Sequence, residues 1–345
     1  MTWRSDRFLR ACRKQPVDMT PVWLMRQAGR SLPEYRKLRE RWTLQDIVAQ
    51  PELCAEVTLQ PVRRFPLDAA VMFADIMLPL QGMGVKFELV ENVGPVIAEP
   101  VRSAADVERL RVPEGEEAAP QVIASVRHVA AESPVPVIGF SGAPFTLASY
   151  MIEGRPSRDF PNSKRFMFAE PEAFDQLLHK LATVMAGYLR AQVAAGASVI
   201  QLFDSWVGAL APEDYATRVA PHTRAVFEAT EDLGVPRIHF GTNTLGLLET
   251  IAATGPDLVS LDWRVGLDEG WRIVGEEKGV QGNLDPGVLL GPADLIRERA
   301  RDVLGRAHGR LGHVFNLGHG VLPETQPDSI AILAEAVHEG VLVDA

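Results

Sequence analysis

The chain has 345 residues, of which 46% are hydrophobic and 23% are charged, and its formal net charge is −10. These values are ordinary for a globular protein, and the acidic balance argues against nucleic acid as a partner. No apolar run reaches the ~20 residues that span a membrane. The first residues are charged and form no apolar signal core, so a cytoplasmic location and no membrane partner are expected.

Short apolar runs alternate with longer helical stretches along the whole chain. Eight runs predict strands, at residues 22–25, 69–73, 135–140, 198–203, 237–240, 258–261, 280–282 and 313–317. Apolar residues spaced by four predict a helix over residues 172–195. Two alternating segments, 85–90 and 93–98, predict a hairpin inserted after the second strand. Strands that alternate with helices indicate a parallel α/β fold.

Eight strand–helix units in a chain of this length fit a (β/α)8 TIM barrel, and we expect residues 1–345 to form one such domain. A doubly wound open sheet is the alternative, but no Gly-x-Gly-x-x-Gly motif follows a strand, so dinucleotide binding lacks support. Active sites of these barrels lie at the carboxyl ends of the strands. Every predicted strand here is followed by polar or glycine residues, so the site is expected at that rim.

An arginine-rich turn and helix follow the first predicted strand. Between positions 26 and 41 two acids stand among six basic residues, which are Arg26, Arg30, Arg36, Lys37, Arg39 and Arg41. Arginine forms bidentate pairs with carboxylates or phosphates, and a turn into a helix adds backbone N–H groups. A solvated helix face with Arg–Glu pairs is the alternative. The stronger interpretation is a clamp for a small polyanion.

Four other side chains near the rim are candidates for the site. Asp75 follows the second strand in an apolar setting, where it could cap a helix or act in catalysis. Tyr150 lies in a predicted helix, where a buried structural role is the alternative. Ser205 has no Gly-x-Ser-x-Gly frame, so a hydrogen-bonding or capping role fits better than that of a nucleophile. His319 lies between two glycines and can approach a ligand closely.

Metal and disulfide sites are not indicated. Cys12 and Cys54 are far apart and have no metal-binding spacing. The eight histidines form neither a His-x-His nor a His-Glu-x-x-His set. The sequence therefore predicts neither a disulfide framework nor a protein-bound metal.

Several of these segments resemble the uroporphyrinogen decarboxylase family. Its two signature segments match residues 23–30 (WLMRQAGR) and 139–154 (GFSGAPFTLASYMIEG). Shorter matches are 73–76 (FADI), 201–206 (QLFDSW), 281–286 (QGNLDP) and 315–323 (FNLGHGVLP). The resemblance covers nearly the full chain. It implies a (β/α)8 barrel, a homodimer, and conversion of uroporphyrinogen III to coproporphyrinogen III without a cofactor.

The same resemblance implies which residues contact the substrate. These are Arg26, Gln27, Ala28, Gly29, Arg30, Arg39, Asp75, Tyr150, Ser205 and His319. Asp75 and Arg26 are the expected catalytic residues. An ionised Asp75 would stabilise the cation that forms when a pyrrole carbon is protonated, and either Arg26 or Arg30 is a candidate for taking part in delivery of that proton. The arginines would hold carboxylates of the substrate, and the other side chains would orient them.

Two other classes of protein stay open. Related barrels that methylate thiols or cobalamin activate a thiol with zinc and need a His/Cys set at the carboxyl rim, whereas both cysteines here precede residue 55. A tetrapyrrole carrier without enzymatic activity would need the arginines but would have no use for a buried Asp75. Turnover by the purified protein separates the three.

Overall fold

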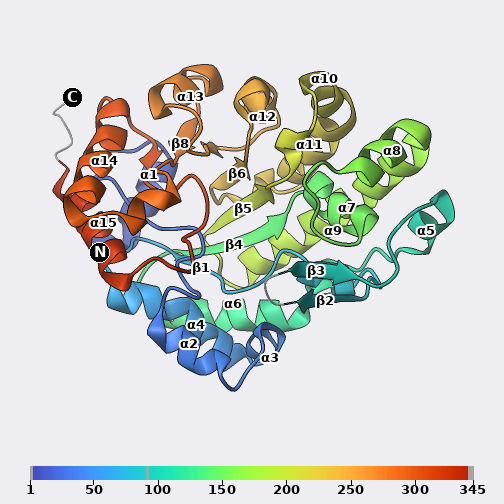
Figure 1. Cartoon of the computed structure of the whole chain (residues 1–345), viewed down its shortest axis with the longest axis horizontal. Coiled ribbons are helices and arrows are strands. Elements are labelled where there is room, and N and C mark those ends of the chain that lie inside the picture. The colour runs from blue at the N-terminus through green and yellow to red at the C-terminus, as the bar shows by residue number, and fades with distance from the viewer. Residues whose placement is uncertain (1–2, 91–92, 341–345) are drawn as a thin grey trace.

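A curled, seven-stranded parallel sheet lies at the centre of the molecule, and helices surround it in a ring (Figure 1). The computed structural model describes residues 3–90 and 93–340, so the first two residues of the charged N-terminus lie outside it. The strands follow the chain order around the sheet. They are β1 (Ala70–Val71), β4 (Val137–Gly142), β5 (Val199–Asp204), β6 (Arg237–Gly241), β7 (Leu258–Ser260), β8 (Gly279–Gln281) and β9 (His313–Val314).

The helices that cover the sheet carry the apolar periodicity seen in the sequence. The predicted helix over 172–195 is confirmed as α9 (Pro171–Ala194). The others are α1 (Trp3–Cys12), α2 (Pro33–Arg39), α3 (Leu44–Val48), α4 (Pro51–Arg64), α5 (Ala104–Arg109), α6 (Pro120–Glu132), α7 (Pro144–Glu153), α8 (Pro161–Ala169), α10 (Pro212–Asp214), α11 (Ala220–Glu228), α12 (Leu248–Ala253), α13 (Leu267–Val274), α14 (Ala293–Arg306) and α15 (Pro327–Glu339). Many of them begin with proline, whose missing N–H is not needed in a first turn.

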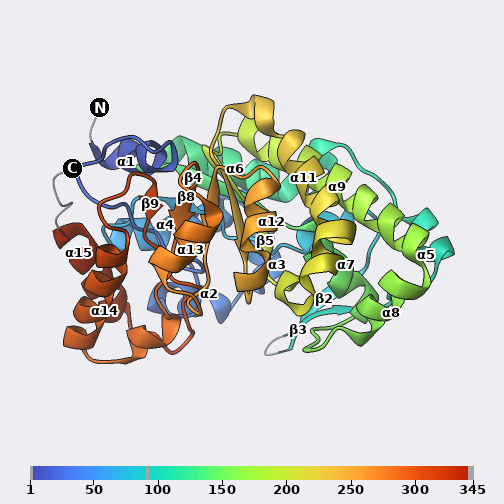
Figure 2. The ribbon, with the colours of Figure 1, turned by 90° about the horizontal axis from the view of Figure 1, so that it is seen from above.

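The core lies on both faces of the sheet. All residues of β4 and β5 are buried, as is typical of parallel strands covered by helices on each face. The predicted hairpin is confirmed as β2 (Phe87–Val90) paired antiparallel with β3 (Gly94–Ile97), and the two residues between these strands lie outside the described chain. In Figure 2 this hairpin and α1 lie at opposite ends of the sheet strands. The hairpin therefore belongs to the end at which the site was predicted.

The first predicted strand, at residues 22–25, is the part of the strand prediction that was wrong. The segment lies between β9 and β1, because Phe315 N–H donates to Pro21 O (2.8 Å) and Asp68 N–H donates to Val22 O (2.8 Å). It makes one isolated parallel bridge, Val22 with Phe315. On the β1 side, the carboxylate of Asp68 takes the Val22 N–H (2.8 Å) in place of a backbone carbonyl. A side chain thus interrupts the ladder that would define a strand.

Two smaller observations complete the fold. Cys12 and Cys54 are both buried free thiols, and burial raises the pKa of each. No helix in residues 3–90 and 93–340 combines the length and the apolar character needed to cross a membrane.

Candidate active site

The turn that carries Arg26 is fixed by buried polar side chains. Gln27 accepts a hydrogen bond from Leu24 N–H (2.9 Å) and donates one to Ala69 O (2.9 Å). Asn316 accepts another from Met25 N–H (3.0 Å). Arg26 itself has a φ of 61°, a left-handed backbone that is uncommon outside glycine, and its side chain is exposed. The surrounding structure therefore holds Arg26 in a conformation that the turn alone would disfavour.

The loop after β9 makes room for the Arg26 side chain. A Cβ atom added to Gly320 would lie 2.4 Å from Arg26 Cδ, so the arginine stem packs directly over this glycine. The absence of a side chain at position 320 is what allows this close approach. The motif around His319 and the arginine turn, nearly 300 residues apart in the chain, thus meet at one place.

Asp75 lies after β1 and before the short 3-10 helix η1 (Leu78–Gln81). Its Oδ1 accepts a hydrogen bond from Met77 N–H (2.8 Å), so part of the capping role considered from the sequence is present. Burial raises the pKa of Asp75, while the Met77 N–H and the positive charge of Arg26 lower it. A desolvated carboxyl group beside an arginine is an arrangement often found in active sites.

Tyr150 and the turn that contains Ser205 are in contact through Trp206. Tyr150, on α7, packs its ring against Trp206, with the centroids 5.8 Å apart and the planes at 68°. The pKa of Tyr150 is raised to about 12, chiefly by burial and also by the charge of Asp75, whereas Trp206 and the charge of Arg26 act to lower it. The turn with half-buried Ser205 is held by Thr146, whose Oγ1 accepts the Trp206 N–H (3.2 Å). Because the pKa of Tyr150 lies far above 7, its phenol is neutral and can donate a hydrogen bond.

His319 lies between aromatic rings on the loop after β9. Its ring centroid is 6.1 Å from that of Phe240 and 6.3 Å from that of Trp263. The pKa of His319 is lowered to about 4, chiefly by burial and also by the charges of Arg26 and Arg264, while the charge of Asp262 acts in the opposite direction. At neutral pH the imidazole is therefore uncharged and offers one donor and one acceptor nitrogen.

Arg26 joins these residues into one site. Its charge acts on Asp75, Tyr150 and His319, which follow three different strands of the sheet. Gln27 is fully buried, and both the oxygen and the nitrogen of its side-chain amide are hydrogen-bonded, so this side chain stabilises the turn. Ala28 and Gly29 lie in that turn.

The two remaining arginines of the predicted set lie just before α2 and at its last residue. Arg30 is exposed shortly before this helix. Arg39, at its end, donates from Nη1 to Trp42 O (2.8 Å). In the described chain, Arg39 also acts electrostatically on Asp46, and no contact joins it directly to Asp75, Tyr150 or His319.

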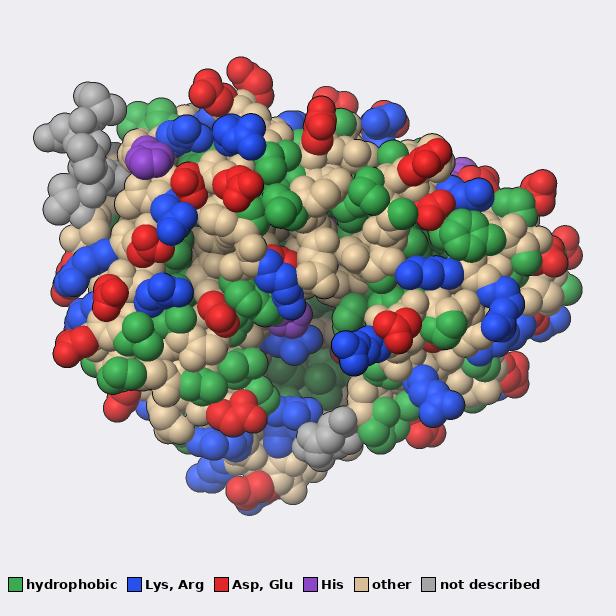
Figure 3. Space-filling model, turned by 45° about the horizontal axis from the view of Figure 1, so that its top comes forward, with side chains coloured by type: hydrophobic (Ala, Val, Ile, Leu, Met, Phe, Trp, Pro, Cys, Tyr) green, Lys and Arg blue, Asp and Glu red, His purple; other side chains and the backbone are tan. Residues whose placement is uncertain are grey.

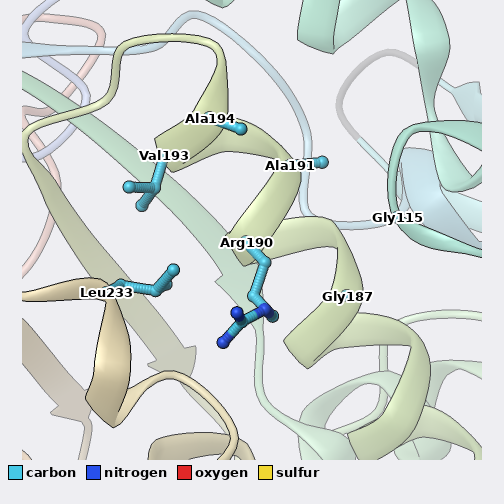
Figure 4. Close-up of a pocket in the computed structure, with 7 residues that line it drawn as sticks. All are labelled: Gly115, Gly187, Arg190, Ala191, Val193, Ala194 and Leu233. Carbon is cyan, nitrogen blue, oxygen red and sulfur yellow. The ribbon is translucent and has the colours of Figure 1, made fainter.

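The molecular surface has a hollow that fits this description. Figure 3 shows it with Lys and Arg side chains around the mouth, a histidine inside and hydrophobic side chains at the bottom. A different groove, of about 510 Å³, lies on the outside of α9 (Figure 4). It is lined mainly by apolar and glycine residues, and its arginine, Arg190, is already paired with Asp232. None of the predicted site residues lines that outer groove.

One residue near the site was not predicted. Arg264, on the loop after β7, lies close enough to His319 to lower the pKa of its imidazole. Its place directly after a predicted strand was the available signal in the sequence. Among residues 3–90 and 93–340, no group of three His, Cys, Asp or Glu side chains is arranged to hold a metal ion.

The fold is that of an α/β protein with a curled parallel sheet, and the candidate site is an arginine-centred, partly desolvated group of residues that follow the strands. The family model for uroporphyrinogen decarboxylase (URO-D) matches residues 4–340. The chain therefore belongs to the uroporphyrinogen decarboxylase family, as the sequence motifs predicted.

Individual relatives agree with this assignment. The uroporphyrinogen decarboxylase of Carboxydothermus hydrogenoformans is 50% identical over 97% of this chain and 96% of its own length. That of Sorangium cellulosum is 52% identical over 96% of both chains, and that of Thermus thermophilus is 51% identical over 97% of this chain and 98% of its own. A solved methyltransferase from Methanosarcina mazei superposes with a TM-score of 0.81 over 97% of this chain and 98% of its own. At 18% identity, this last likeness shows a shared fold only.

Proposed function

We propose that this chain is a uroporphyrinogen decarboxylase that converts the four acetate side chains of uroporphyrinogen III into methyl groups, giving coproporphyrinogen III. Membership of the family, with relatives at about 50% identity along nearly the whole chain, supports the activity. The observation that carries the chemistry is the convergence of Asp75, Tyr150 and His319 on Arg26.

The substrate explains the charge of the site. Uroporphyrinogen carries eight carboxylates, and an acidic protein must capture such a polyanion locally. Arg26 and Arg30 are exposed at the arginine turn, where guanidinium forks can pair with carboxylates. The neutral side chains of Tyr150 and His319 can donate hydrogen bonds to further carboxylates without adding charge.

The reaction needs an acceptor for the electron pair that is left when CO2 departs. Protonation of a pyrrole carbon makes the ring cationic, and the pair from the broken C–CO2 bond then flows into the ring. This leaves an exocyclic methylene group, which takes up a proton to become the methyl group while the ring carbon releases the proton that it had gained. Each acetate carboxylate therefore consumes one proton net and yields a methyl group and CO2. Asp75 would accept hydrogen bonds from pyrrole N–H groups and stabilise the cation, most strongly where water is excluded. No cofactor enters this scheme.

We further propose the finer features that the family resemblance implies. Residues 21–25, hydrogen-bonded to Phe315 on one side and to Asp68 on the other, would occupy the place of the eighth strand and close a single (β/α)8 barrel domain over residues 1–345. A homodimer in the cytoplasm is part of the same proposal. Gel filtration with light scattering tests the dimer, with a monomeric mass as the contrary result.

The activity is tested with purified protein and uroporphyrinogen III under reducing, anaerobic conditions. Products are oxidised to porphyrins and separated by carboxylate number, and the four-carboxylate species is expected to accumulate. The same assay with a strong chelator should give an unchanged rate. Activity that is lost on chelation and restored by zinc would instead favour the thiol methyltransferase class, and binding without turnover would favour a carrier.

A further inference from the structure

The loop after β7 presents a second oriented arginine. The guanidinium carbon of Arg264 lies 3.9 Å from the centroid of the Trp263 ring, in stacking contact. Its Nη1 lies 3.1 Å from Asp262 Oδ2, and its backbone N–H donates to Asp262 Oδ1 (2.8 Å). The side chain is nevertheless 45% exposed. Arg264 is therefore held in one orientation while much of its surface stays open to solvent.

The loop itself is anchored to the neighbouring strands. Asn283, just after β8, donates from Nδ2 to Asp262 O (2.8 Å) and to Val265 O (2.7 Å). The carboxylate of buried Asp262 also accepts the backbone N–H of Asn243, which follows β6. Hydrogen bonds from the segments after β6 and β8 thus fix the backbone of the loop around Arg264. The entropy cost of ordering this loop when a ligand binds is therefore small.

This loop borders the predicted site. The Trp263 ring lies edge-on to the His319 ring, at 6.3 Å and 89°. A Cβ on Gly318 would come within 2.3 Å of Trp263 N, so the two loops are in direct contact. The charges of Arg264 and Arg26 both act on the imidazole of His319. The two arginines therefore neighbour the same histidine.

We propose that Arg264 is a further substrate-binding residue, which holds a carboxylate of the tetrapyrrole at the rim beside His319. This inference rests on the proposed function. The eight carboxylates of the substrate outnumber the arginines of the predicted set, so additional cations at the rim have anions to bind. Among the contacts within residues 3–90 and 93–340, the ion pair with Asp262 uses Nη1 alone, which leaves Nε and Nη2 as donors for a bidentate pair.

The alternative role for Arg264 is a structural ion pair with Asp262. Steady-state kinetics with uroporphyrinogen III distinguish the two roles when Arg264→Gln and Arg264→Lys are compared with the wild type. Loss of a charge-assisted contact made equally in the ground and transition states should raise KM about tenfold in Arg264→Gln and leave kcat near its wild-type value. Arg264→Lys should recover part of the loss.

Arg190→Gln is the matched control. Arg190 is 43% exposed and paired with Asp232, much as Arg264 is paired with Asp262, but it lies on the outside of α9. Its replacement should leave KM unchanged. A second readout is the salt dependence of KM, which should be weaker in Arg264→Gln than in the wild type because one ionic contact with substrate is gone.

The proposal is overturned if Arg264→Gln keeps a wild-type KM, or if its KM rises while the salt dependence stays that of the wild type. An inactive wild-type protein would contradict the proposed function instead, so the two failures are distinguishable. Should Arg264→Gln fold poorly, Arg264→Lys carries the test through KM alone, because lysine keeps the charge but loses the bidentate fork; a raised KM supports the proposal and a wild-type KM contradicts it.

Discussion

Two arginines at opposite ends of the sheet differ in whether other residues of the protein neutralise their charge. At the amino ends of the strands, Arg7 is buried and bonded to Asp68 (2.6 Å) and Asp18 (2.6 Å). At the carboxyl ends, Arg26 is exposed and forms no ion pair with any residue of 3–90 and 93–340. Arg7 is thus satisfied within the protein, whereas Arg26 keeps its hydrogen-bonding capacity for a ligand.

Two aspartates show the same contrast. Asp68 is fully buried and bonded to the Val22 N–H (2.8 Å), to Arg7 and to His338 Nε2 (2.7 Å), so it joins the first segment to α1 and α15. Asp75 has a hydrogen bond from Met77 N–H, and burial raises its pKa. A saturated buried charge holds elements together, while an undersaturated one is available for chemistry. The following predictions test this division.

The largest expected effect is on turnover by Asp75→Asn. The amide keeps the shape and the acceptor for Met77 N–H but removes the charge that would stabilise the pyrrole cation. We expect kcat to fall by about 10²–10³, with little change in affinity for coproporphyrinogen, because the charge matters most in the transition state. Asp75→Glu should retain partial activity. Normal turnover by Asp75→Asn would mean that Asp75 only caps the following turn and is not needed for catalysis.

The same variant should not be less stable than the wild type at neutral pH. The fold raises the pKa of Asp75, so an ionised Asp75 disfavours the folded state at pH values above its unfolded pKa. Removing that charge relieves the penalty. Urea unfolding of Asp75→Asn checks this, and a clear loss of stability would mean that Asp75 is part of the scaffold.

The opposite pattern is expected for Asp68→Asn. Breaking a buried ion pair should lower the free energy of unfolding by about 3 kcal/mol, at the low end of the usual range because Asp18 stays with Arg7. The kcat of the folded enzyme should be unchanged. The measurement is a pair of urea titrations with equal slopes. Asp18→Asn, whose side chain is 30% exposed, is the control and should have a smaller effect.

Arg26→Lys should have a smaller effect on activity than Asp75→Asn. Lysine keeps the charge but loses the bidentate fork, so we expect kcat/KM to fall by about 10–100-fold without unfolding. Arg30→Lys tests the neighbouring position in the same assay. Arg127→Lys, an exposed residue paired with Glu116, is the control and should be silent. Wild-type kinetics in both turn variants would restore the interpretation of a solvated helix face.

The smallest effect concerns pH and His319. Its pKa is about 4 in the fold, below the ordinary value of 6.5, so between these values the unfolded chain binds a proton that the folded chain does not. The free energy of unfolding should therefore fall as the pH drops from 6.5 towards 4. His319→Asn should flatten part of this slope, and His313, which is also buried with a pKa of about 4, should account for another part. An unchanged slope in His319→Asn would contradict the depressed pKa.

Local sequence patterns determined much of this protein. Apolar runs located all seven strands of the sheet and the hairpin of β2 and β3, and the periodicity of four located α9. Because parallel strands align their carboxyl ends, the segments after the strands were enough to predict that Asp75, Ser205 and His319 lie at one rim. Motifs in the sequence also identified the family.

Contacts between distant residues decided the rest. The segment at 22–25 has a strand-like sequence but loses its ladder to the carboxylate of Asp68, more than 40 residues away. Gln27 braces the turn through Ala69, and Arg26 takes a left-handed backbone over Gly320. Arg264 becomes part of the rim only through Trp263 and His319. Hydrophobic periodicity is a property of neighbours in the chain, whereas the direction of a charged side chain depends on which distant groups satisfy it, and only the tertiary structure supplies those groups.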